Sequence, residues 1–321
     1  MSLEEDRLKA LTYTRPEFIP VAVGVLPAAW MKYREDLDAL AAQHPILFRP
    51  DLIGRRDYDQ VGGTYVAGNH VDEWGCVWSN LHTGMEAIVT GHPVPTRQAV
   101  RQLKPPESVT ARMPHGFMYL RLGDLRGFDE IMTDFAEEPP ELQMLIDVVL
   151  AHNLRQLELR LQNERGPLLY FGDDLGMQDR LPISPKKWRR YLKPCFARLY
   201  GRCHDAGLVV YMHTDGHILE IIPDLIECGV DVINPQIRAN GLEKLAAICK
   251  GKVCVDLDLD RQAFPFFTPA ECDAHIREAV ETLGSPDGGL WLKAEIGPDV
   301  PLENIAAICD GLEKYRAWFT K

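Results

Sequence analysis

The second half of the chain alternates short apolar segments with helical ones, and this rhythm constrains its fold most. The apolar segments are rich in β-branched residues and span residues 167–172, 207–213, 229–234, 252–258 and 289–295. Their continuous apolar character is typical of strands buried on both faces of a parallel sheet. Helices are predicted between them, and two begin with an N-cap residue before proline, at Ser184–Pro185 and Thr268–Pro269. The repeat predicts an α/β protein.

The remaining predicted elements extend this repeat toward the N-terminus. Strands are expected at 18–26 and 117–123, and a weaker one near 71–78. Residues 50–115 are irregular and predict a loop or hairpin insertion that carries this weak strand. The predicted helices span residues 28–42, 139–163, 185–206, 217–228, 241–250, 269–283 and 301–319.

Eight strands in 321 residues favour a single (β/α)8 TIM barrel over residues 1–321. We expect an N-terminal helical extension and an insertion at about 50–115, after the first βα unit. No break in composition and no internal repeat marks a second domain. The rival is an open doubly wound sheet, but neither GxGxxG nor GxxxxGK[ST] follows any predicted strand.

Charge and cysteine content narrow the class of protein. Lys and Arg number 35 against 47 Asp and Glu, a net charge of −12, which argues against a nucleic-acid partner. Eight cysteines occur without a CxxC pair, which fits a reducing cytoplasm. No targeting signal and no apolar stretch long enough to cross a membrane is recognisable, so we expect a cytoplasmic protein without membrane contact.

Polar residues follow the predicted strands where TIM barrels carry their active sites. His213 and Asp215 end one strand at positions i and i+2, so both side chains can reach one metal ion. A helix cap by Asp215 and a packed His213 explain the same pattern equally well.

Carboxylates are crowded at the other strand ends. They include Asp173, Asp174 and Glu295, while Asp256, Asp258 and Asp260 alternate along one strand face. Facing one lumen, they would repel one another unless a cation, a cationic partner or bound protons relieved the repulsion. Any single one could instead cap a helix or pair with arginine. Further residues expected to line the mouth are Glu73, Trp74, Gln178, Asn234 and Gln236, although Trp74 could equally belong to the core.

Three segments resemble the uroporphyrinogen decarboxylase superfamily of TIM barrels, which includes the decarboxylase and corrinoid-linked methyltransferases. They are GDDLGMQDRLPISPKKWRRYLKP (172–194), VVYMHTDGHILEIIPDLIECGVDVINPQ (209–236) and AEIGPDVPLENIAAI (294–308). The resemblance covers nearly the whole chain and implies the barrel fold and, as in many relatives, a homodimer.

Departures from the family pattern indicate a branch closer to the methyltransferases than to the true decarboxylase. The decarboxylases carry an arginine motif after the first strand, whereas this chain has Val23-Gly24-Val25-Leu26-Pro27 there. The methyltransferases bind zinc through HxC and a later cysteine. Here His213 matches, but Asp215 and Glu295 stand at the thiolate positions. A site with one imidazole and two carboxylates is a harder ligand set than one with thiolates, and it admits zinc, manganese or iron.

The resemblance therefore implies a divalent metal, zinc first, bound by His213, Asp215 and Glu295. Asp173 or Asp174 would act as general acid or base, and Glu73, Trp74, Gln178, Asn234, Gln236, Asp258 and Asp260 would hold a small substrate. The expected reaction moves a methyl or other C1 group from an O- or N-methylated molecule to a corrinoid protein. Two alternatives remain open: a cofactor-free decarboxylase or lyase, and a non-catalytic ligand-binding barrel.

Overall fold

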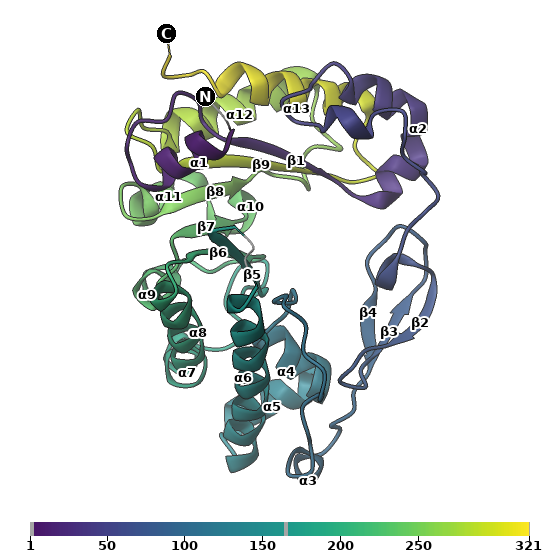
Figure 1. The fold of residues 1–321 in the computed structure, drawn as a ribbon, viewed down its shortest axis with the longest axis vertical. Coiled ribbons are helices and arrows are strands. Elements are labelled where there is room, and N and C mark those ends of the chain that lie inside the picture. Colours follow the sequence, from purple (N-terminus) through teal and green to yellow (C-terminus); the bar gives the residue numbers. More distant parts are fainter. Residues whose placement is uncertain (1–2, 164–165, 321) are drawn as a thin grey trace. The chain divides into compact units, whose positions relative to one another are not determined.

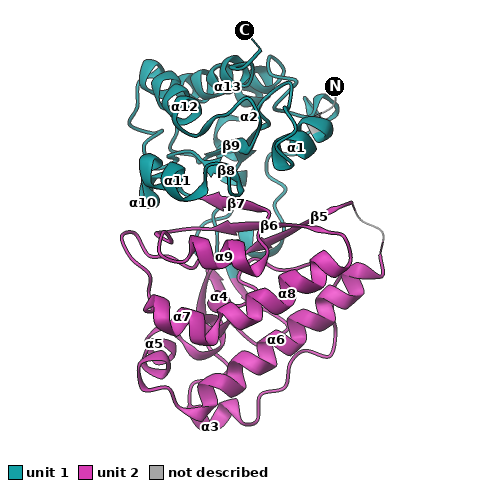
Figure 2. Cartoon of the chain, turned by 90° about the vertical axis from the view of Figure 1, so that its left-hand side faces the viewer, with its two compact units in different colours: residues 1–68, 80–87, 236–321 teal, residues 69–79, 88–235 magenta. Residues whose placement is uncertain are grey.

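The structure is a computed structural model that describes residues 3–163 and 166–320 (Figure 1). The chain divides into two compact units (Figure 2). Unit 1 comprises Met1–Gly68, Asn80–Ala87 and Gln236–Lys321, and unit 2 comprises Asn69–Ser79 and Ile88–Pro235.

Unit 1 is built on three parallel strands in the order β1-β9-β8. These are β1 (Val21–Val25), β9 (Leu290–Ile296) and β8 (Cys254–Asp258). Every residue of β8 is buried, as expected for a strand covered on both faces. The helices of this unit are α1 (Leu3–Leu11), α2 (Pro27–Ala41), α10 (Ile237–Asn240), α11 (Leu242–Cys249), α12 (Pro269–Leu283) and α13 (Leu302–Tyr315), with 3-10 turns at Pro50–Leu52 and Gly63–Tyr65.

Unit 2 contains three parallel strands in the order β7-β6-β5. These are β7 (Val232–Pro235), β6 (Val209–Thr214) and β5 (Leu168–Gly172). The helices are α3 (Arg97–Val100), α4 (Tyr119–Arg126), α5 (Phe128–Glu137), α6 (Pro140–Leu161), α7 (Pro185–Tyr191), α8 (Lys193–Asp205) and α9 (Ile222–Cys228).

One face of the unit 2 sheet is packed by aromatic side chains. Phe171 of β5 contacts Phe117 and Tyr200 with ring centroids 5.2 and 4.9 Å apart. Phe196 of α8 joins the same cluster, and all four rings are buried. Because side chains alternate along a strand, Tyr170 and Gly172 belong to the opposite face of the sheet from this aromatic cluster.

Most predicted elements are confirmed. The strands expected at 18–26, 167–172, 207–213, 229–234, 252–258 and 289–295 are β1 and β5 to β9, six parallel strands within the described residues. The helix expected at 185–206 is divided into α7 and α8, because Pro194 lacks the N–H that would continue one helix. The alternation of strand and helix thus establishes an α/β fold.

Two predicted strands are wrong. Residues expected to form a barrel strand near 71–78 instead form a turn between β2 (Gly68–Val71) and β3 (Val77–Asn80), in a three-stranded sheet β2-β3-β4 with β4 at Ile88–Gly91. The Asp72 carboxylate makes this turn by accepting the N–H groups of Trp74 and Cys76. The predicted hairpin insertion is therefore present, without its barrel strand.

The strand expected at 117–123 is helical. Helix α4 occupies Tyr119–Arg126 and buries Leu122 and Leu125 at helical spacing. Its alternating apolar residues mimic a strand because the helix is buried on more than one side. No helix within residues 3–163 and 166–320 has the length and apolar character needed to cross a bilayer.

Candidate functional site

The candidate site lies at the carboxyl ends of β5 and β6 in unit 2. Asp173 and Asp174 follow β5 directly, and His213 and Asp215 stand at and just after the end of β6. The parallel register places Gly172 opposite His213. The two polar sequences therefore emerge side by side, as expected for neighbouring parallel strands.

A third segment brings in His115, which sequence reasoning missed. His115 forms an isolated parallel bridge with Gly172, and the Gly116 N–H donates to the Gly172 carbonyl over 2.7 Å. The chain therefore runs beside β5 for one residue before it turns into α4. The one sequence signal near His115 is the apolar segment at 117–123, which begins two residues after it.

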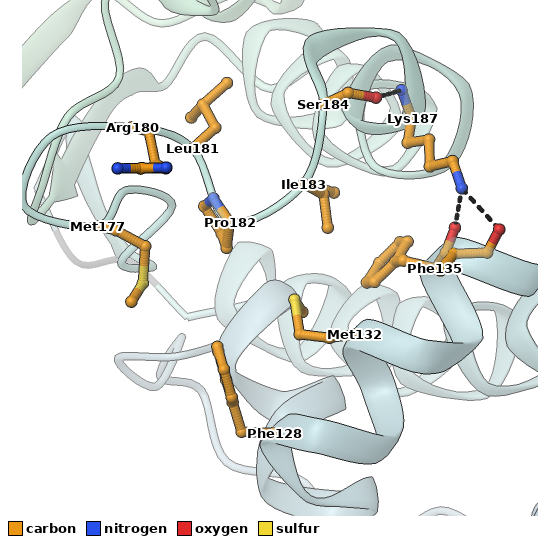
Figure 3. A pocket seen from close by; sticks show the side chains of 11 residues that line it. Phe128, Met132, Phe135, Met177, Arg180, Leu181, Pro182, Ile183, Ser184 and Lys187 are labelled. Atoms are coloured by element: carbon orange, nitrogen blue, oxygen red, sulfur yellow. Dashed lines mark hydrogen bonds between the residues drawn. The ribbon is translucent and has the colours of Figure 1, made fainter.

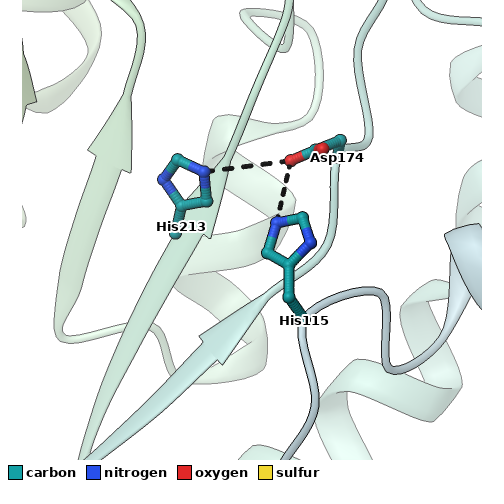
Figure 4. A group of neighbouring side chains, drawn as sticks. All are labelled: His115, Asp174 and His213. Carbon is teal, nitrogen blue, oxygen red and sulfur yellow. Dashed lines mark ion pairs between the residues drawn. The ribbon is translucent and has the colours of Figure 1, made fainter. Parts of the chain in front are cut away.

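His115, Asp174 and His213 form one cluster (Figure 4). The Asp174 Oδ1 atom lies 3.3 Å from Nε2 of His115 and 3.9 Å from Nε2 of His213. Asp215 adds a second carboxylate, with Oδ1 3.3 Å from the same His213 nitrogen. Within the described residues this is the one group of three or more His, Cys, Asp or Glu whose ligand atoms lie within 4.8 Å of one another.

Hydrogen bonds orient these side chains. The Nδ1 atom of His213 lies 2.6 Å from Oδ1 of Asn234 on β7, and because an amide oxygen only accepts, Nδ1 carries the proton. In the neutral imidazole the Nε2 lone pair then points toward the cluster. Asp174 Oδ1 also accepts the backbone N–H of Asp215 over 3.0 Å. The structure thus brings together the predicted residues Asp174, His213, Asp215 and Asn234.

The electrostatics of Asp174 and His115 are coupled. Burial disfavours the charged form of Asp174, but hydrogen bonds with His115 and the Asp215 N–H prevail and lower its pKa. The same hydrogen bond with Asp174 raises the pKa of His115. An ionised carboxylate and two imidazoles together form a donor set for a divalent cation.

Asp173 has different surroundings. Its side chain is fully buried and accepts backbone N–H groups from Met118, Tyr119 and Leu120 over 3.2, 2.5 and 2.9 Å. Burial raises the pKa of Asp173 to about 7 despite these bonds. The carboxylate satisfies the free N–H groups at the start of α4, which is the contribution of a helix cap.

The other predicted residues of unit 2 lie apart from these contacts. Trp74 is buried and packs edge-on against His152, with ring centroids 4.9 Å apart, as in the core alternative. Glu73 and Gln178 are exposed.

Four of the residues predicted to form the site belong to unit 1. Glu295 forms an ion pair with Arg261, and Asp260 pairs with Arg238 at 3.1 Å. Asp258 is buried within β8, and Gln236 forms a bridge with it.

A separate cavity of about 500 Å³ lies in unit 2, between α5 and the loop that leads to α7 (Figure 3). Its wall is mainly apolar, and its two cations are engaged elsewhere: Arg180 with Asp179, and Lys187 with the carbonyls of Phe135 and Ala136. The chemistry-bearing side chains therefore gather at the cluster and not in this cavity. Apolar lining residues include Phe128, Met132, Phe135, Met177, Leu181 and Ile183.

Solved structures resemble the chain only distantly. A dihydropteroate synthase from Xanthomonas albilineans with 4-aminobenzoic acid is 20% identical over 50% of this chain and 57% of that chain, with a TM-score of 0.33. One from Stenotrophomonas maltophilia is 21% identical over 48% and 55%, with a TM-score of 0.31. The chain thus spans little more than half the length of these synthases. A sugar phosphate isomerase/epimerase from Parabacteroides distasonis is 10% identical over 92% and 95%, with a TM-score of 0.37.

A family comparison covers the site itself. No curated protein matches the chain. The family model described as "Uroporphyrinogen decarboxylase (URO-D)" matches residues 114–315, which is more than half of the chain and includes His115, Asp174 and His213. The chain therefore belongs to the uroporphyrinogen decarboxylase family.

Proposed function

We propose that this chain is a metal-dependent (β/α)8-barrel enzyme of the methyltransferase type. The observation that carries the proposal is the convergence of His115, Asp174 and His213, whose ligand atoms lie within 4.8 Å of one another. Two imidazole nitrogens and one carboxylate form a common donor set for zinc, manganese or iron in enzymes. The comparisons support an enzyme of this family and leave the reaction to be tested.

The proposed ligands are His115, Asp174 and His213, with the Asp215 carboxylate beside them. This set replaces Glu295, because that carboxylate already pairs with Arg261 in unit 1. Asn234 would hold His213 in the tautomer that leaves Nε2 available as a ligand. When bound, the divalent ion would supply Lewis-acid polarisation of a substrate heteroatom.

The donor set favours oxygen or nitrogen substrates over thiols. No thiolate is available, because all eight cysteines are buried and none belongs to the cluster. We therefore propose demethylation of a small O- or N-methylated molecule, with the methyl group passing to a separate corrinoid protein. Asp215, next to His213 Nε2, is the residue placed to exchange a proton with the substrate heteroatom.

A second candidate is a carboxy-lyase acting on a small carboxylated substrate. The family description favours it, since the matching model is that of a decarboxylase. The two candidates differ in their need for metal: a decarboxylase without cofactor keeps its turnover after chelation, whereas the proposed methyltransferase loses it.

Elemental analysis of the purified protein tests the proposal. We expect about one divalent ion per chain in the wild type. His213→Ala should remove it, whereas His204→Ala should retain it, because His204 pairs with Asp231 away from the cluster. Equal metal content in both variants would sink the proposed ligand set. Methyl ethers and methylamines, assayed with a reduced corrinoid acceptor, and small carboxylates, assayed without one, then separate the two candidate reactions when each is measured before and after chelation.

A further inference from the structure

Three glycines occupy the places where the segments carrying the cluster touch one another. Gly172 ends β5 beside His115, Gly176 follows Asp174 by two residues, and Gly216 follows Asp215 directly. Each contact leaves no room for a side chain, as the spacing around ideal Cβ positions shows.

At Gly172, an added Cβ would lie 2.5 Å from Cδ2 of the His115 ring. The ring could not keep its position against such a Cβ. Because the Gly116 N–H holds the neighbouring backbone to the Gly172 carbonyl, the ring would have to turn, and turning would carry its Nε2 away from Asp174. Gly172 does not adopt the left-handed conformation, so alanine would not be excluded by backbone strain. The space around the imidazole is what requires glycine here.

Gly176 and Gly216 lie in direct backbone contact. A Cβ on Gly176 would be 2.5 Å from the carbonyl carbon of Gly216, and one on Gly216 would be 2.7 Å from Cα of Gly176. The same two loops are joined by hydrogen bonds from Gly176 N–H to the Asp215 carbonyl (3.2 Å) and from His217 N–H to the Met177 carbonyl (2.7 Å). This contact fixes the loop that carries Asp174 against the loop that carries Asp215.

We propose that Gly172, Gly176 and Gly216 are positioning residues that set the spacing of the metal ligands. Gly172 places His115 against Asp174, and the Gly176–Gly216 contact places Asp174 against His213 and Asp215. The inference rests on the proposed metal site. It adds that the affinity for metal depends on these three glycines, which are not ligands themselves. Their lack of a side chain leaves the ligands room to approach one another.

Gly172→Ala is the most direct variant. Zinc titration against a chromophoric chelator should show an affinity about tenfold to a hundredfold weaker than that of the wild type, the range found when residues supporting metal ligands are changed. Gly24→Ala is the matched control, since Gly24 also lies in a parallel strand and nothing would stand within 4 Å of its Cβ. Gly176→Ala should weaken zinc binding as Gly172→Ala does.

A double-variant cycle separates positioning from general destabilisation. In a His115→Ala background the ring is gone, so adding Gly172→Ala should change zinc affinity by less than about twofold. Equal losses in both backgrounds would overturn the role of Gly172. The double variant also lacks the clash, so it reports even if Gly172→Ala alone folds poorly.

Crystal structures of the metal-free proteins provide a readout that does not depend on zinc. In Gly172→Ala, the distance from His115 Nε2 to Asp174 Oδ1 should exceed the 3.3 Å of the wild type, with the Asp174–His213 spacing retained. An unmoved ring would refute the inference. If the wild type bound no zinc while Gly172→Ala showed the predicted ring displacement, the proposed function would be contradicted and the steric role of Gly172 would stand.

Discussion

At the scale of single residues, the cluster is defined by what each polar atom contacts. His213 uses Nδ1 on Asn234 and keeps Nε2 for the site, while Asp174 receives the Asp215 N–H and faces both imidazoles. The adjacent Asp173 is turned the other way and bonds to backbone N–H groups. Two neighbouring aspartates thus differ in role because successive side chains at a strand end point to opposite faces.

Asp124 provides a prediction about pH. Burial raises the pKa of this carboxyl from 3.8 to about 6, and the Arg121 guanidinium at 3.7 Å compensates only in part. Between these values the folded state binds more protons than the unfolded state, so its stability should fall as pH rises from about 4 to 6. A shift of this size corresponds to about 3 kcal/mol at most.

Asp124→Asn should remove that fall. Urea unfolding of the wild type and the variant from pH 4 to pH 7 measures the difference between their free energies of unfolding. The variant should gain stability relative to the wild type as pH rises, with most of the change below about pH 6. Parallel curves over this range would show that Asp124 ionises normally.

At the scale of elements, α4 depends on a residue far away in sequence. Its first N–H groups bond to Asp173, which stands more than fifty residues later. Neither this cap nor the bridge between His115 and Gly172 has a local sequence signal, because both form only when the chain has folded. By contrast, β5 to β9 were predictable since their apolar runs and flanking caps are local features.

Asp173→Ala should therefore act on stability. It leaves three N–H groups, two of them buried, without their acceptor. We expect a loss of about 2–3 kcal/mol in the free energy of unfolding, with metal content preserved. Asp147→Ala is the control, because Asp147 is exposed and accepts a hydrogen bond from Gln143 on the same helix, α6. If Asp173→Ala abolished turnover at unchanged stability, a catalytic role for Asp173 would be required instead.

At the scale of the whole molecule, the structure shows which partners individual acidic residues have. The net charge of −12 first argued only against nucleic acid. Several of the acids lie at strand ends as predicted, but they serve different purposes: Asp174 and Asp215 face imidazoles, whereas Glu295 and Asp260 pair with arginines. Spacing in the sequence indicated which carboxylates could lie at strand ends. It carried no information on which of them would pair with an arginine side chain.

The central claim is that one divalent ion binds His115, Asp174 and His213. Anomalous diffraction at the zinc edge, from crystals grown with zinc, tests it most directly. We predict one peak at about 2.0–2.2 Å from Nε2 of both histidines and from an Asp174 oxygen. A map without a peak between these three side chains, or with its strongest peak elsewhere in the chain, would contradict the account.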